Sequence, residues 1–425
     1  MNYRLVPLPL SLLLLAACGS NGGSPTGSTT VIDIAKAIDS PVELKVSDLG
    51  SKITYVPFET LDESLIPNKW MLIPTDTHLI VSCISSSGMK DTHSMAFDMN
   101  GRFIASIGHV GDDPEAYSSP IPVIGQNDNM YFPKWGANEK PSWVEYDVKG
   151  KYLGHYFPDI LVSPQSSQFL DTTIVTVKTF GTLYTDGIHP VVYSGGMNGG
   201  IDSLIVDHIP EEQIEHYSYH GAYINGVSGV IHNTTDSYYE IEEINGNQRH
   251  DYVADRTIQF LWKTDGKLHY RYPMNDTIYA VTPKSFEPIY TFDCGKTALK
   301  HENFNHKEFP RDIVLVSEMC ETPTMIVFGA SRGWMSVEGH KPFVGYFDKA
   351  TGRTTATQAD KGFVDDITNF MPFYPIRSNN RGDLFGILTI EDIQAWQEEH
   401  PGVELPEALR DINEDSNPIC VIVSK

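Results

Sequence analysis

The chain has 425 residues, enough for one large domain or two ordinary ones. It carries 55 acidic and 31 basic side chains, a formal charge of −24. This charge repels nucleic acid and anionic membrane surfaces, so we expect no nucleic-acid partner.

Residues 1–17 are expected to be a lipoprotein signal peptide that is removed. Arg4 precedes an apolar run that ends at Leu15-Ala16-Ala17-Cys18. The run is too short to span a bilayer. Small residues directly before a cysteine form a lipobox, whose cysteine thiol takes up a diacylglycerol. We therefore predict lipidation of Cys18, which makes the membrane a partner through an N-terminal lipid.

Residues 18–45 are expected to contain the lipidated cysteine and a flexible tether. Residues 21–30 hold Gly, Ser, Thr and Pro but no large apolar residue, a composition typical of a linker. No acidic cluster follows Cys18. We therefore expect an outer-membrane lipoprotein on the periplasmic side, with the cell surface as the alternative.

From residue 46 onward, short strands dominate the predicted elements. Segments such as 53–58, 79–84 and 325–328 are rich in Val, Ile, Tyr and Phe and are bounded by turn residues. Asn100-Gly101 between two such segments predicts a type I′ hairpin. The composition thus indicates an all-β fold.

The hairpin pattern returns along the chain, at 144–153, 262–268 and 346–353. Gly101, Gly150, Gly196 and Gly246 follow one another at intervals of 49, 46 and 50 residues. A period near 50 in a chain of strands indicates β-propeller blades. We expect one propeller over residues 46–425 with six blades, or seven; a two-domain β-sandwich explains the strands but not the repeated hairpin.

A small helical insertion is expected near the C-terminus. Residues 389–400 repeat apolar side chains at helical spacing between Thr389, a suitable N-cap, and Pro401. Residues 405–412 show a second helical pattern. The apolar segment 419–423 is expected to close the ring by pairing with 53–58.

Five segments resemble the six-bladed β-propeller lipoproteins of Bacteroidetes. They are residues 47–60, 97–117, 275–279, 362–367 with 373–375, and 415–418. The resemblance implies the propeller fold and an extracytoplasmic location, and it supplies no catalytic residues. Asp113 and Ala116 stand where the family tends to have glycine.

No nucleophile elbow, zinc-protease motif or phosphate-binding loop is found, so candidate site residues come from acidic clusters. The clusters are Asp112, Asp113 and Glu115; Glu240, Glu242 and Glu243; and Asp365 with Asp366. Such carboxylates bind ligands, hold Ca²⁺, act as a glycosidase acid and base, or remain solvated loop charges. Asp365 and Asp366 stand out because apolar residues flank them, which predicts that at least one is partly buried.

Trp135 is the predicted contact for a glycan, because it lies between Pro133 and Gly136 in an expected loop and sugar rings stack on exposed aromatic faces. The alternative is an ordinary tryptophan packed between blades. Cys83, Cys294, Cys320 and Cys420 allow two disulfides, but their apolar strand contexts favour buried free thiols.

These patterns favour a lipid-anchored, extracytoplasmic binding or scaffold propeller over an enzyme. Its expected partner is a glycan or a protein of an outer-membrane uptake system. The alternative is a glycoside hydrolase or polysaccharide lyase on the same scaffold, because fold alone does not set activity. We expect no metal or cofactor; Ca²⁺ at the acidic clusters is a weak alternative.

Overall fold

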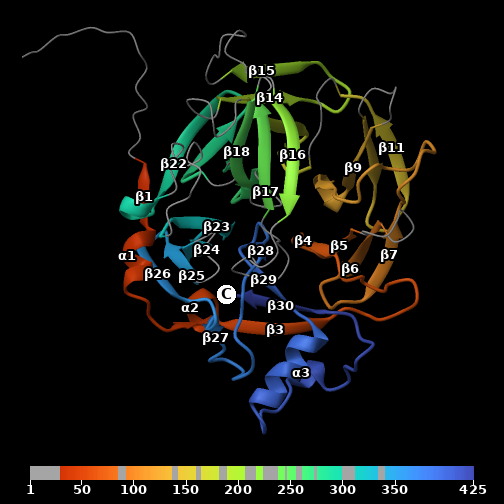
Figure 1. Cartoon of the computed structure of the whole chain (residues 1–425). Coiled ribbons are helices and arrows are strands. Elements are labelled where there is room, and N and C mark those ends of the chain that lie inside the picture. The colour runs from red at the N-terminus through yellow and green to blue at the C-terminus, as the bar shows by residue number, and fades with distance from the viewer. Residues whose placement is uncertain are drawn as a thin grey trace, which may run out of the picture.

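The computed structural model shows a ring of six blades (Figure 1). Each blade is a sheet with four antiparallel strands as its repeating unit. The prediction of an all-β, six-bladed propeller is confirmed, and seven blades are excluded. The structure describes residues 29–84, 92–135, 142–158, 164–180, 189–205, 217–223, 238–244, 247–254, 261–271, 275–298, 312–333 and 340–425.

Blades 1 to 3 follow one another along the chain. Blade 1 contains β4 (Trp70–Pro74), β5 (His78–Cys83), β6 (His93–Asp98) and β7 (Phe103–Ile107). Blade 2 contains β8 (Val123–Ile124), β9 (Met130–Lys134), β10 (Ser142–Tyr146) and β11 (Tyr152–Tyr156). Blade 3 contains β12 (Ser167–Leu170), β13 (Thr173–Phe180), β14 (His189–Gly195) and β15 (Ile201–Ile205).

Blades 4 to 6 complete the ring. Blade 4 contains β19 (Leu261–Thr264), β20 (Lys267–Tyr270), β21 (Thr277–Thr282) and β22 (Ser285–Asp293). Blade 5 contains β23 (Val314–Glu321), β24 (Met325–Arg332), β25 (Lys341–Asp348) and β26 (Arg353–Gln358). Blade 6 contains β28 (Arg377–Ser378), β29 (Leu384–Leu388), β30 (Ile419–Ser424) and β3 (Lys52–Pro57).

A further three-stranded sheet lies between blades 3 and 4 in the sequence but is not a blade. It consists of β16 (Tyr217–Tyr223), β17 (Tyr238–Ile244) and β18 (Asn247–Ala254). Blades 3 and 4 pack directly on each other, because Val175 and Val192 share one core with Leu261 and Val281. The sheet is therefore an insertion in the connection between two neighbouring blades.

The ring closes through strands from opposite ends of the chain. β3 pairs antiparallel with β30, from Lys52 opposite Ser424 to Pro57 opposite Ile419. Figure 1 shows red β3 beside dark blue β30. The predicted pairing of 419–423 with 53–58 is confirmed. Both strands have apolar side chains on both faces, as burial between two neighbouring blades requires.

Every junction between neighbouring blades has its own apolar core. Phe97 of blade 1 packs with Phe385 of blade 6, and Phe132 of blade 2 packs in the cluster that holds Ile80 of blade 1. The remaining junctions are built in the same way. Burial of apolar surface on both faces of each sheet therefore holds the ring together.

The chain before residue 46 corrects the expected tether. β1 (Thr30–Asp33) joins blade 4 as a fifth strand, parallel to β22, and α1 (Ile34–Asp39) follows it. Ile32, Ile34 and Ile38 are buried in the core between blades 4 and 5. The boundary at residue 45 was wrong, because these isoleucines give residues 30–45 a buried face that a linker lacks. β2 (Leu44–Lys45) pairs with β27 (Phe363–Val364), and α2 (Val46–Leu49) leads into β3.

The helical insertion near the C-terminus is present. α3 spans Ile390–Glu399, and Thr389 is its N-cap. The Thr389 side chain forms a capping box with Asp392. The second expected helix is only the single 3₁₀ turn η6 (Glu407–Leu409). Other 3₁₀ turns are η2 (Gln126–Asp128) and η4 (Gly295–Thr297). Among the described residues, no helix has the length and apolar character needed to cross a membrane.

The two ends of the blades differ by topology. Because neighbouring strands are antiparallel, turns between the first and second strands and between the third and fourth strands lie at one end. We call this the turn end; residues 99–102, for example, join β6 to β7 there. Gly101 has a positive φ but Asn100 does not, so this turn is not the predicted type I′. The middle connection of each blade and the connection to the next blade lie at the other end, which we call the loop end.

The repeated hairpin is confirmed only in part. The hairpins at 98–102, 147–151 and 348–353 join the third and fourth strands of blades 1, 2 and 5. The hairpin at 262–268 instead joins the first two strands of blade 4. Gly246 lies outside the described residues. The apparent period therefore holds for blades 1 to 3 and is then broken by the insertion that contains β16–β18.

Candidate functional site

The loop end of blade 2 brings together four of the predicted site residues. Asp112, Asp113 and Glu115 lie in the connection from β7 to β8, and Trp135 directly follows β9. The Lys134 side chain donates a hydrogen bond to the backbone carbonyl of Asp113. Trp135 and the acidic loop are thus neighbours, although the sequence analysis treated them as separate candidates.

The acidic loop is held in one shape by its own contacts. The Asp113 carboxylate contacts His109 Nε2 at 2.5 Å and accepts the backbone N–H groups of Glu115 and Ala116. The hydrogen bond with His109 is the main reason why the pKa of Asp113 is lowered. Asp112 and Glu115 are exposed beside it. The loop therefore presents carboxylates on a fixed backbone.

Tyr117 anchors this loop from below. It is fully buried, and its hydroxyl donates to the Ile107 carbonyl at 2.8 Å. Gly108 has a φ of +56°, and a Cβ there would lie 2.8 Å from ring atoms of Tyr117 and Tyr146. Only glycine permits this close packing. The Tyr146 hydroxyl also donates to the Glu115 carbonyl at 2.5 Å.

Trp135 is 49% exposed, so the alternative of a tryptophan packed between blades does not describe it. Its backbone is fixed by Ser118, whose Oγ accepts the Trp135 N–H at 3.0 Å and donates to the Trp135 carbonyl at 3.1 Å. Phe157, directly after β11, is 51% exposed at the same end of the blade. This end therefore offers aromatic surface beside carboxylates.

Asp365 and Asp366 diverge instead of forming a pair. Asp365 is 3% exposed, which confirms that one of the two is buried. Its carboxylate accepts the Tyr55 hydroxyl at 3.0 Å, the Thr368 hydroxyl, and the backbone N–H groups of residues 367, 368 and 370. These bonds occupy both oxygens and fasten β3 to the connection between blades 5 and 6.

Asp366 instead fastens α2. It accepts the backbone N–H of Ser47 at 3.0 Å and the Ser47 hydroxyl at 2.6 Å. Burial opposes ionisation, but the two bonds from Ser47 outweigh it and leave the pKa of Asp366 lowered. The ligand role of Asp365 and Asp366 stays a prediction, which this geometry does not favour.

The remaining candidates are placed as follows. Cys18 lies outside the described residues, as do the side chains of the cluster at Glu240, Glu242 and Glu243 in β17. Cys83, Cys294, Cys320 and Cys420 are buried free thiols, as favoured over disulfides. Burial raises the pKa of Cys83, Cys294 and Cys320 to about 12, so these thiols are poor nucleophiles at neutral pH.

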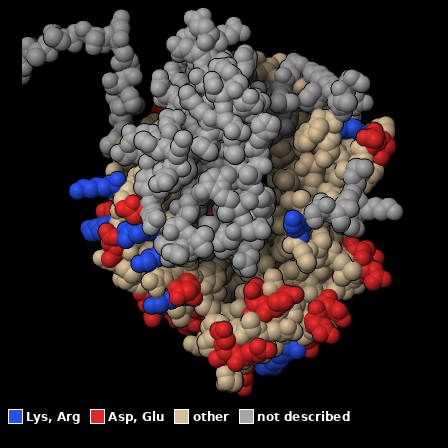
Figure 2. Space-filling model, viewed as in Figure 1, with Lys and Arg blue, Asp and Glu red and all other residues tan. Residues whose placement is uncertain are grey.

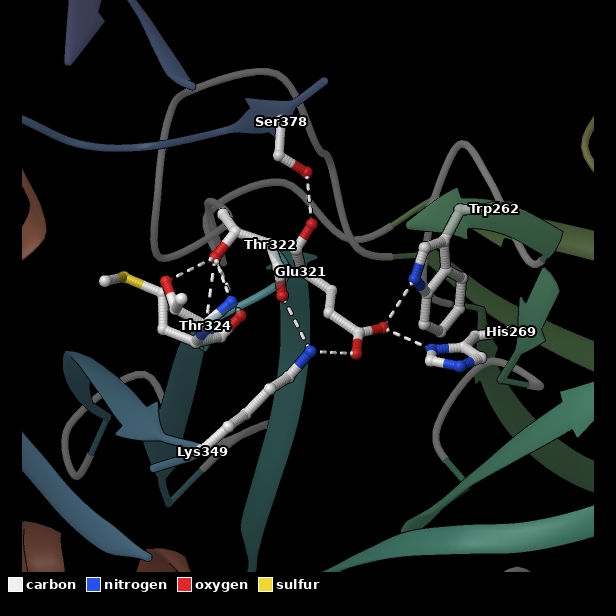
Figure 3. Close-up of polar contacts among 8 residues, drawn as sticks. Trp262, His269, Glu321, Thr322, Thr324, Lys349 and Ser378 are labelled. Carbon is white, nitrogen blue, oxygen red and sulfur yellow. Dashed lines mark hydrogen bonds and ion pairs between the residues drawn. The ribbon is translucent and has the colours of Figure 1, made fainter. Parts of the chain in front are cut away.

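One buried polar cluster was missed by the sequence analysis (Figure 3). Glu321, the last residue of β23, is fully buried. Its Oε2 accepts from Trp262 Nε1 at 2.8 Å and contacts His269 Nδ1 at 2.7 Å. Its Oε1 pairs with Lys349 Nζ at 2.6 Å, and its backbone carbonyl accepts the Ser378 hydroxyl. The cluster thus joins blades 4, 5 and 6.

The electrostatics of this cluster indicate a structural role. Burial would raise the pKa of Glu321, but hydrogen bonds and charges from His269 and Lys349 outweigh it, so the pKa is lowered. The carboxylate is bonded at both oxygens and its side chain is fully buried, so it is shielded from solvent. The partners His269 and Trp262 lie 52 and 59 positions from Glu321 in the chain. The cluster therefore forms no local sequence motif from which it could be predicted.

Within the described ranges, no three His, Cys, Asp or Glu side chains come together as a metal-binding group. Figure 2 shows Asp and Glu over α3 and along the right of the molecule, while Lys and Arg gather on the left around α1 and β26. The charges on the face shown in Figure 2 are therefore unevenly distributed.

The family described as "Domain of unknown function (DUF4934)" matches residues 29–424. The chain belongs to this family. The match begins at β1 and ends in β30, so this DUF4934 protein includes the N-terminal segment that packs on blade 4. No curated protein matches the chain.

Among solved structures, this DUF4934 protein is similar to a "Putative exported protein" from Bacteroides fragilis, with a TM-score of 0.58 and 14% identity. The match covers 94% of this chain and all of that one, and at this identity it shows the shared fold. A puromycin-hydrolysing peptidase from Mycobacterium tuberculosis matches at a TM-score of 0.31 and 10% identity, over 76% of this chain and 50% of that one. That score carries no argument about activity.

Proposed function

We propose that this DUF4934 protein is a lipid-anchored, extracytoplasmic binding propeller that holds a glycan at the loop end of blade 2. The observation that carries the proposal is Trp135, an indole half exposed on a backbone fixed by Ser118. A rigid aromatic face binds the apolar face of a sugar ring with little loss of conformational freedom. Asp112 and Glu115 supply acceptors for sugar hydroxyls beside it.

Charge narrows the class of glycan. Asp112, Asp113 and Glu115 give the loop three carboxylates, and the whole chain carries −24. Uronates and sulfated sugars would meet like charge there. The preferred ligand is therefore a neutral oligosaccharide.

The location follows from the sequence of the leader and from the family resemblance. The lipobox at Cys18 supports an outer-membrane anchor, with the periplasmic side favoured. The similar Bacteroides fragilis protein is named as exported, which agrees with this location. A binding protein there would hand a glycan to an uptake system.

A glycan array tests the proposal with the purified full-length protein in detergent. We expect binding of neutral oligosaccharides, weaker binding of their anionic counterparts, and no change in the glycans by mass spectrometry after prolonged incubation. Binding confined to anionic glycans, or to none, would contradict the proposal. Cleavage of a bound glycan would favour the hydrolase or lyase alternative instead.

The anchor has its own test. Cys18→Ala is expected to leave the protein uncleaved or to release it from membranes. If the variant is processed and still sediments entirely with membranes, the anchor assignment is wrong.

A further inference from the structure

The connection from β3 to β4, residues 58–69, exposes two leucines at the junction of blades 6 and 1. Leu61 is 40% exposed and Leu65 is 53% exposed. Asp62 and Glu63, which lie between them, are exposed as well. A single exposed leucine is ordinary on a protein surface, but two in one short segment call for a physical reason.

A buried serine fixes the backbone next to both leucines. Ser64 is fully buried. Its Oγ accepts the Leu61 N–H at 2.9 Å and donates to the Glu59 carbonyl at 2.6 Å. The Ser64 N–H donates to the Leu61 carbonyl at 3.0 Å. Residues 61–64 thus close as a turn around the hydroxyl, and Leu65 directly follows it.

Asn417 of blade 6 locks the same segment and is 4% exposed. Its Oδ1 accepts the Ile66 N–H at 2.9 Å, and its Nδ2 donates to the carbonyls of Glu59 and Ser64 at 2.9 and 2.8 Å. Its own N–H donates to the Thr60 hydroxyl. These bonds use every hydrogen-bonding atom of the asparagine side chain.

Blade 1 holds the segment from the other side. The Glu59 N–H donates to the Gly101 carbonyl at 2.8 Å, and the Phe103 N–H donates to Glu59 Oε2 at 2.9 Å. The segment is therefore built by polar contacts to both neighbouring blades.

A rigid loop with solvent-exposed apolar side chains resembles a docking site for a partner protein. Preorganisation lowers the entropy that a partner must overcome on binding. A small apolar centre within a polar rim is the usual arrangement of a protein interface. Here Leu61 and Leu65 form the centre, and Asp62 and Glu63 form part of the rim.

Charge decides what kind of partner fits. Among the described residues, neither Asp62 nor Glu63 takes part in an ion pair. A second copy of a chain that carries −24 would be repelled. We propose that the 58–69 connection docks a partner protein through a segment whose apolar side chains are flanked by Lys or Arg. This proposal is independent of the glycan site at Trp135.

A synthetic amphipathic peptide tests the proposal. The probe is a 14-residue helix-forming peptide of Leu and Lys at helical spacing, and its counterpart carries Glu in place of every Lys. Fluorescence anisotropy measures binding to the full-length protein in detergent. We expect the Lys peptide to bind and the Glu peptide not to bind. The double variant Leu61→Ser with Leu65→Ser should bind the Lys peptide at least about tenfold more weakly.

Matched variants separate docking from general attraction to an acidic protein. Leu153→Ser, at an exposed leucine of β11, and Glu398→Lys with Glu399→Lys, on α3, should leave peptide affinity within about twofold. Asp62→Lys with Glu63→Lys should weaken it about tenfold and reduce its salt dependence. Trp135→Ala should leave peptide binding unchanged, and the leucine variant should leave glycan binding unchanged.

Four results would overturn the proposal: no binding of the Lys peptide, equal binding of the Glu peptide, unchanged peptide affinity in the leucine variant, or equal loss in the α3 variant. A wild-type dimer in light scattering that the leucine variant abolishes would assign the surface to a second copy instead. Unchanged melting temperatures in all variants are required for these comparisons.

Discussion

The connections at the turn end of the blades differ from those at the loop end in length and in the side chains that they expose. Within the blades, connections at the turn end are two to five residues long, while those at the loop end have six residues or more. At the turn end, Asn379 Nδ2 of blade 6 donates to the Thr75 carbonyl of blade 1. Asp128 of blade 2 accepts the hydroxyls of Thr75 and Thr77 and contacts His78. Neighbouring blades are thus bonded directly through their short turns.

The loop end also carries hydrogen bonds that hold the ring, such as those of Asn417 and Asp365, but it exposes more apolar surface. Six of the nine large apolar residues that are exposed in the described part of the chain lie in its connections: Leu61, Leu65, Ile84, Trp135, Phe157 and Val364. None of the nine lies in a turn at the other end. The two ends therefore differ in what they expose: among the described residues, the turn end exposes no large apolar side chain, whereas the loop end exposes several that are available for recognition.

The largest expected effect comes from breaking the ring itself. Removing residues 415–425 deletes β30, and with it the strand partners of both β29 and β3. Because two apolar cores lose members at once, we expect the cooperative thermal transition to disappear in circular dichroism. Removal of Lys425 alone, which follows β30, is the control and should change little. A truncated protein with an unchanged melting curve would show that closure is not needed.

The next effect concerns the buried charge that joins three blades. Glu321→Gln should lower the free energy of unfolding by about 3–5 kcal/mol, because Lys349 would stay buried without its negative partner. Glu43→Gln removes an exposed partner of Lys45 and should cost no more than about 1 kcal/mol. Urea unfolding measures both. Equal, small losses would mean that the cluster contributes no more than a surface pair.

The same residue predicts how stability depends on pH. Glu321 has a folded pKa below its ordinary value of 4.5. Its contribution is therefore fully present above pH 4.5 and is lost as pH falls through the folded pKa. Wild type should lose stability below pH 4.5 more steeply than Glu321→Gln. Parallel curves for the two proteins would contradict the lowered pKa.

A smaller effect compares one turn position in two blades. Gly101 and Gly352 both lie in a turn between third and fourth strands, with φ of +80° and +70°. A Cβ at Gly101 would lie 2.2 Å from the Pro57 carbonyl oxygen of blade 6, whereas one at Gly352 meets nothing within 4 Å. Gly352→Ala should cost about 1–2 kcal/mol from backbone strain alone. Gly101→Ala should cost more, and equal losses in urea unfolding would show that the contact with blade 6 relaxes.

The fold was predictable because its signals are local. Alternating apolar segments and the Asn100-Gly101 turn identify strands and hairpins, and the apolar run 419–423 has to be buried on both faces. The insertion around β16–β18 was not separable from a blade, because it also consists of strands. The packing of residues 30–45 on the propeller was not predicted. Their few isoleucines are buried only because β1 pairs with β22 at the edge of blade 4.

The candidate site was predictable only residue by residue. Trp135 was chosen for its loop context, and its exposure agrees with that choice. Trp135 lies near Asp113 because blade 2 folds so that Lys134 contacts the Asp113 carbonyl. Residue spacing in the sequence does not predict this proximity. Asp365 was chosen for apolar flanks, which correctly indicated burial. In the structure, the buried Asp365 carboxylate accepts five hydrogen bonds. One comes from Tyr55, near the other end of the chain, and could not be predicted from the local sequence.

The most direct test of the division between the two ends is isothermal titration of a neutral oligosaccharide with Trp135→Ala, beside Leu153→Ala on the outer strand β11. The account predicts that Trp135→Ala weakens binding about tenfold or more, or about 1.4 kcal/mol, while its melting temperature stays that of wild type. Leu153→Ala should change neither quantity. Unchanged affinity in Trp135→Ala, or a loss of affinity matched by a loss of stability, would contradict the claim that the loop end carries the binding site.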